Sequence, residues 1–162
     1  MLGTGEPAPA FELLDLDGEH QRLGDALTVG PALVAFWKPD CATCHLAFPY
    51  LQRLVDVYPS GGWRLLAVSQ ESATASAAFA RRYGAMFPVL IDGIGWPVSQ
   101  LYDPEATPTF FLIAPNGTIE MTSVGFDKVE LNEIAGRLAG YLGEPAEEFA
   151  TENDDNPPFQ PG

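Results

Sequence analysis

The 162-residue sequence has few cysteines, few basic residues and no long apolar segment. Its two cysteines cannot crosslink a domain of this size as the disulfides of a small secreted fold do. Only 8 Lys and Arg stand against 22 Asp and Glu, for a net charge of −14. Because such a chain repels nucleic acid phosphates and anionic lipid, both are excluded as partners. No apolar run approaches the roughly 20 residues that span a bilayer, so we expect no membrane span.

The N-terminal stretch MLGTGEPAPAF contains neither a basic side chain nor an apolar segment. A secretory signal needs both. We therefore expect a cytoplasmic protein from the sequence as it stands, and a periplasmic or extracytoplasmic one if a leader has been removed. The 46% of hydrophobic residues is typical of a globular chain, which we expect to be a monomer.

The acidic charge is concentrated at one end of the chain. Residues 144–162 contain six acids and no base, interleaved with four prolines. Because this composition buries too little apolar surface to offset the entropy of ordering, it predicts a disordered acidic tail. Residues 1–143 then form one domain, which is long enough for a single core.

Hydrophobic patterns within residues 1–143 predict alternating strands and helices. Continuous apolar runs indicate strands covered on both faces, and apolar positions at helical spacing indicate amphipathic helices. The expected strands are 11–14, 20–23, 33–37, 65–68, 87–91, 109–114 and 118–124, and the expected helices start near Cys41, Ser72, Val98 and Asp127. This order predicts an α/β fold with a mixed central sheet flanked by helices.

The two cysteines, Cys41 and Cys44, stand where a buried strand is followed by a helix. The start of a helix presents unpaired N–H groups and about half a positive charge, and both stabilise a thiolate. With two residues between them, the second thiol can reach a mixed disulfide formed by the first. The spacing predicts a redox dithiol in which Cys41 attacks and Cys44 resolves, with no cofactor or metal.

The sequence of residues 36–44, FWKPDCATC, resembles the FWxxxCxxC signature of the thioredoxin superfamily. Pro49 matches the helix-kinking proline of that family, and Thr107-Pro108 resembles its cis-proline loop. The leading GEPAPAFELLDLDGE and the βα unit between residues 65 and 91 are similar to the TlpA-like redoxin branch. The resemblance covers roughly residues 5–142.

The resemblance implies a thioredoxin-like fold with an N-terminal hairpin and an inserted βα unit. It also implies a thiol–disulfide oxidoreductase that exchanges electrons with protein or small-molecule disulfides and with an upstream thiol reductant. The residues implied to contact substrate are Trp37, Thr107 and Pro108, and those implied to shape the site are Lys38, Pro39 and Pro49. Two positions where family members carry a buried acid hold Ala35 and Ala47.

Other readings of the cysteine pair remain open on the residues alone. Cys41 to His45 also spells CxxCH, the attachment motif for c-type haem. A zinc site needs about four ligands, and the only histidines are His20 and His45. A peroxiredoxin carries a threonine three residues before its reactive cysteine, where this chain has Lys38 or Cys41. A non-enzymatic module whose disulfide switches a partner contact is the remaining alternative.

Overall fold

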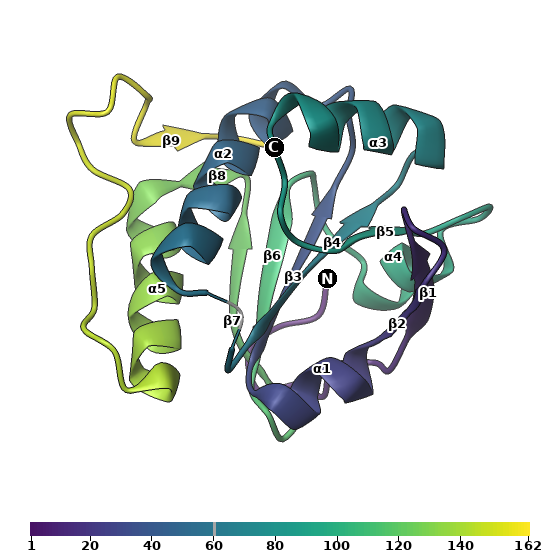
Figure 1. Ribbon diagram of the computed structural model, residues 1–162, viewed down its shortest axis with the longest axis horizontal. Coiled ribbons are helices and arrows are strands. Elements are labelled where there is room, and N and C mark those ends of the chain that lie inside the picture. The colour runs from purple at the N-terminus through teal and green to yellow at the C-terminus, as the bar shows by residue number, and fades with distance from the viewer. Residues whose placement is uncertain (60) are drawn as a thin grey trace.

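The computed structural model describes residues 1–59 and 61–162, arranged around a seven-stranded sheet (Figure 1). The strand order is β2-β1-β5-β4-β3-β6-β7, and β3 pairs parallel with β4 and antiparallel with β6. The strands of the sheet are β1 Glu12–Asp15, β2 His20–Arg22, β3 Ala32–Trp37, β4 Arg64–Ser69, β5 Val89–Ile91, β6 Thr109–Ile113 and β7 Ile119–Val124. The helices are α1 Leu23–Val29, α2 Ala42–Val57, α3 Ala73–Arg82, α4 Pro97–Tyr102 and α5 Lys128–Leu142. The predicted mixed α/β architecture is confirmed.

Strand β3 is central because both of its faces are covered. All six of its residues are buried, which explains the continuous apolar run. Leu33, Ala35 and Trp37 join the core that the sheet forms with α2, α3 and α5. Val34 and Phe36 point to the opposite face and pack with residues of α1 and α4. The chain that leaves β3 therefore emerges at the edge of a rigid layer, where the cysteines follow.

The N-terminal hairpin and the inserted βα unit are joined in one sheet. Strand β1 pairs antiparallel with β2 on one side and with β5 on the other. Helix α3 begins where predicted, since the Ser72 side chain accepts a hydrogen bond from Ala75 N. Helix α1 was not predicted, because it has only seven residues and buries only Leu23 and Ala26. None of the helices formed by the described residues is long and apolar enough to cross a membrane.

Residues 144–162 pack against the domain, in contrast to the disorder expected from their composition. Phe149 and Ala150 are 5% and 2% exposed. Strand β9, Phe159–Gln160, pairs antiparallel with β8, Phe126–Asp127. Figure 1 shows the segment in yellow, running beside α5 and then returning to the N-terminal end of α2. The burial of two apolar side chains, together with several polar contacts, stabilises the docked segment despite its acidic, proline-rich composition.

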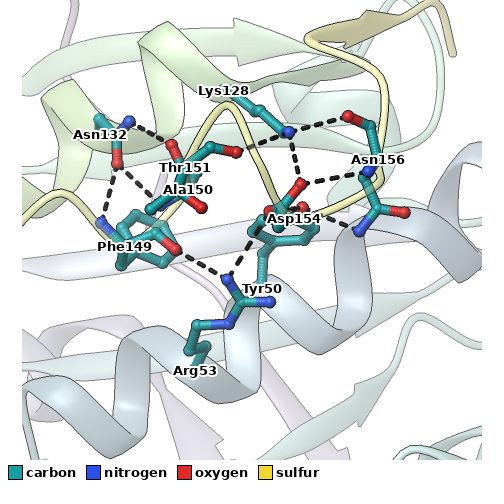
Figure 2. Close-up of polar contacts among 9 residues, drawn as sticks. All are labelled: Tyr50, Arg53, Lys128, Asn132, Phe149, Ala150, Thr151, Asp154 and Asn156. Carbon is teal, nitrogen blue, oxygen red and sulfur yellow. Dashed lines mark hydrogen bonds and ion pairs between the residues drawn. The ribbon is translucent and has the colours of Figure 1, made fainter.

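A buried ammonium group provides the principal polar anchor (Figure 2). Lys128 is 5% exposed, and its Nζ donates to the backbone oxygens of Thr151 and Asn156, both at 2.8 Å. It also pairs with Asp154 Oδ1 at 2.5 Å, and Asp154 accepts a hydrogen bond from the Tyr50 hydroxyl. Three oxygens of one short loop therefore surround the ammonium, which satisfies a charge that is costly to bury alone.

A second anchor holds the backbone on either side of Phe149. The Asn132 side chain on α5 accepts from Phe149 N and Ala150 N, at 3.1 and 3.0 Å, and donates to Ala150 O at 2.8 Å. Arg53 on α2 donates to Phe149 O at 2.8 Å. The segment is thus bound to both helices.

We predict that Phe149→Ala lowers the free energy of unfolding by about 3 kcal/mol, because it leaves a cavity where an aromatic ring is buried. The control is Phe159→Ala in the same segment, whose ring is 53% exposed. That change should cost less than about 0.5 kcal/mol. Urea unfolding of both variants measures the difference, and equal losses of stability would contradict the greater contribution assigned to the buried ring of Phe149.

The stability of the protein should depend on pH because of the ion pair between Lys128 and Asp154. Partial burial alone would raise the pKa of Asp154, but hydrogen bonds from Lys128, Tyr50 and Asn156 N lower it to about 2, from the ordinary 3.8. Because the pKa is lower in the folded state, the stabilisation is complete above about pH 4 and is lost as the pH falls towards 2.

The stability difference between the wild type and Asp154→Asn should therefore be largest near neutral pH and shrink below about pH 4. Urea unfolding at a series of pH values measures it. Asp155→Asn removes the same charge from the exposed neighbouring side chain and is the control. A difference that does not change with pH would contradict the role of the ion pair.

Candidate active site

Cys41 occupies the N-cap of α2, directly after the loop that follows β3. Its backbone is extended, and its Sγ accepts a hydrogen bond from Cys44 N at 3.1 Å. Both cysteines are free thiols, 8% exposed for Cys41 and 1% for Cys44. A sulfur at this position faces the unpaired N–H groups of the helix start, which favour a negative charge there. Cys44 lies one turn deeper, as the sequence predicts.

The loop from Lys38 to Asp40 is held against the first turn of α2. Cys41 N donates to Lys38 O at 3.3 Å. His45 Nε2 lies 3.0 Å from Pro39 O, and its Nδ1 lies 2.6 Å from the Tyr83 hydroxyl. The imidazole therefore connects this loop to the end of α3. From the sequence, His45 was considered as a haem ligand, a zinc ligand or a partly solvated side chain, and its contact with Tyr83 was missed.

The loop before β6 meets the cysteine turn, although 66 residues separate them. The Thr107–Pro108 peptide bond is cis, and the Cys41 thiol lies 3.1 Å from Thr107 O, to which it donates. Two hydrogen bonds fix this loop: Thr109 Oγ1 donates to Ala106 O at 2.6 Å, and Gly125 N to Pro108 O at 2.8 Å. The structure thus brings Cys41, Thr107 and Pro108 together.

The surroundings of Cys44 disfavour its thiolate. Burial raises the pKa of Cys44, and the neighbouring Cys41 sulfur raises it further through a hydrogen bond and charge repulsion. The positions at which family members carry an acid hold methyl groups, since Ala35 and Ala47 are 0% and 2% exposed. Neither of these positions offers Cys44 a base.

Trp37 differs from its predicted role of contacting substrate. The side chain is 1% exposed and lies between Phe48 and Phe79, with ring centroids 4.7 Å away in each case. It therefore supports the site from behind and presents no surface to a bound molecule. Pro49 lies inside α2, one turn beyond the cysteines, where it removes one hydrogen bond of the helix.

Thr43, between the two cysteines, contacts the C-terminal segment. Its Oγ1 donates to Pro161 O at 2.6 Å and accepts from Gln160 Nε2 at 2.8 Å, and the residue is 5% exposed. Sequence reasoning missed this contact because it treated residues 144–162 as disordered. No local sequence pattern relates Thr43 to Gln160, which lies 117 positions away.

Comparison with known proteins identifies a matching family, similar sequences and similar solved structures. Residues 4–122 match the AhpC/TSA family. Thiol-disulfide oxidoreductase ResA of Geobacillus kaustophilus is 34% identical over 125 residues, which are 76% of this chain and 71% of the relative. ResA of Bacillus subtilis is also 34% identical over 125 residues, 76% of this chain and 69% of the relative. The crystal structure of a putative thiol:disulfide interchange protein DsbE from Chlorobium tepidum is 27% identical with a TM-score of 0.77, covering 86% of this chain and 98% of that one.

The different surroundings of the two thiols lead to a prediction about alkylation. In the folded protein, iodoacetamide should modify Cys44 of a Cys41→Ser variant at least about tenfold more slowly than Cys41 of a Cys44→Ser variant, because Cys44 is buried as a thiol. Mass spectrometry over time gives both rates. In denaturant the two rates should converge, and equal rates in the folded variants would contradict the described burial.

Proposed function

Because this chain belongs to the AhpC/TSA family and, like its ResA relatives, is a thiol–disulfide oxidoreductase, we propose that Cys41 is its attacking thiol and Cys44 its resolving thiol. The observation that supports the assignment most directly is the N-cap position of Cys41, whose sulfur accepts the Cys44 N–H bond. A charge that forms on this sulfur is stabilised by the helix start, whereas Cys44 is buried behind it.

The proposed reaction exchanges two electrons in two steps. The Cys41 thiolate attacks one sulfur of the substrate disulfide, forms a mixed disulfide and releases the other sulfur as a thiolate. Cys44 then loses its proton and attacks Cys41 Sγ, which breaks the mixed disulfide and releases the second substrate thiol. The chain is left with a Cys41–Cys44 disulfide, and an upstream thiol reductant returns it to the dithiol. The chain acts as a monomer in this scheme.

The second step depends on the proton of Cys44. Burial raises the pKa of this thiol, so the deprotonated form is scarce at neutral pH. Positions 35 and 47 hold alanine, so neither provides a carboxylate to accept this proton. The released substrate thiolate is a base that the reaction itself supplies. We propose that it accepts the Cys44 proton, which couples resolution to the first step.

The cis-proline loop is the proposed substrate-holding element. Thr107 O lies within hydrogen-bond distance of the Cys41 thiol, so a substrate beside Thr107 and Pro108 is also beside the attacking sulfur. Backbone groups of such a loop can pair with an extended polypeptide by strand addition. Lys38 and Pro39 are proposed to shape the site from the loop before α2, where the Lys38 backbone oxygen accepts from Cys41 N and the Pro39 backbone oxygen contacts His45 Nε2.

We predict that Cys44→Ser accumulates mixed disulfides with substrate, because the resolving thiol is missing and the first step remains. Non-reducing electrophoresis detects these adducts, and dithiothreitol should dissolve them. Cys41→Ser is the matched control, because it keeps the same number of thiols and should trap few or no partners. If both variants trap substrate equally, the assignment of attacker and resolver is wrong.

A further inference from the structure

The last six residues of the sequence lie against the active site. Thr43, between the cysteines, exchanges hydrogen bonds with Gln160 and Pro161. A methyl group on Gly162 would lie 2.7 Å from Thr107 O, so the backbone of Gly162 directly contacts the carbonyl that accepts the Cys41 thiol. Residues 157–162 therefore touch both sides of the attacking sulfur, the CxxC turn and the cis-proline loop.

The segment binds in the manner of an extended peptide. Strand β9 pairs antiparallel with β8, with Gln160 opposite Phe126, and Lys128 N donates to Pro158 O at 3.0 Å. A methyl group on Gly125 would lie 2.7 Å from Gln160 O, so the two backbones are in direct contact. Backbone pairing along a strand edge is one of the modes by which proteins recognise an extended polypeptide.

The contacts of residues 157–162 are separable from the anchors that precede them. Phe149 and the Lys128–Asp154 pair hold residues 149–156. Beyond Asn156 the segment contributes exposed prolines and the Phe159 ring, which is 53% exposed. No side chain of this stretch is buried in the core, so it can leave the site without disturbing the domain.

We propose that residues 157–162 act as an internal competitor that occupies the docking surface for an extended, disulfide-containing polypeptide at the edge of β8. The inference rests on the proposed function and specifies its substrate class. Because the anchors keep the segment close to its site, it competes at a high effective concentration. A polypeptide substrate must displace it before its disulfide reaches Cys41. A small disulfide needs only the sulfur and none of the strand edge.

The test is a truncation after Asn156, which keeps every anchor in Figure 2. Single-turnover stopped-flow measurements compare the reduced full chain and the reduced truncated chain. The substrates are an unstructured disulfide-linked peptide and 2-hydroxyethyl disulfide. We expect the ratio of the peptide rate to the small-disulfide rate to rise about tenfold on truncation, since the competitor is gone.

A peptide added in trans provides the matched control. The peptide PPFQPG should inhibit the truncated chain's reaction with the peptide disulfide, and the reversed peptide GPQFPP, of the same composition, should not. Should the truncated chain fail to fold, Gln160→Ala in the full chain is the second variant. It removes the hydrogen bond to Thr43 and should raise the same rate ratio.

The outcomes separate the two proposals. An unchanged ratio, or an equal acceleration of both substrates, would overturn the competitor assignment and leave the dithiol chemistry intact. If neither chain reduces either disulfide, the proposed roles of Cys41 and Cys44 are wrong instead.

Discussion

The hydrogen bonds of the Cys41 sulfur bring the site together. The sulfur accepts from Cys44 N at the start of α2 and donates to Thr107 O in the loop before β6. One atom thereby joins the helix, the cis-proline loop and, through Thr107, the C-terminal segment. The arrangement depends on β3, whose two covered faces fix the point from which the cysteine turn emerges. A shift of β3 would separate the sulfur from both partners.

The two thiols differ in environment because they occupy different positions at the start of α2. The unpaired N–H groups of α2 face Cys41, whereas Cys44 lies within the first turn, below Cys41 and in the core. The aromatic group of Trp37, Phe48 and Phe79 excludes water behind the pair. Dry surroundings raise the cost of a negative charge on Cys44, so the packing that stabilises the fold also favours the protonated form of this thiol.

The elements that sequence predicts well are those with local signals. The apolar run of β3, the capping residues Ser72 and Asp127, and the spacing of the cysteines each depend on a few neighbouring residues. The docking of residues 144–162 depends instead on distant partners, because Phe149 needs a site between α2 and α5.

Side-chain roles at the site were harder to predict than its position. Trp37 was expected to contact substrate, yet the packing of α3 buries it, and no local pattern reveals that packing. The link from His45 to Tyr83 likewise joins two helices that are distant in sequence. Such roles depend on which helices and strands pack against each other. That packing is determined by the complete fold and not by a local stretch of sequence.

The contact between Thr43 and Pro161 spans 118 positions, among the longest separations in the chain. Closing so long a loop has a large entropic cost and is favoured only after the sheet and its helices are in place. We therefore expect β9 to dock late in folding. Contacts that form after the transition state govern how fast a structure opens and have little effect on how fast it forms. Substitutions in residues 157–162 can thus change how long this segment stays docked without changing the folding rate of the domain.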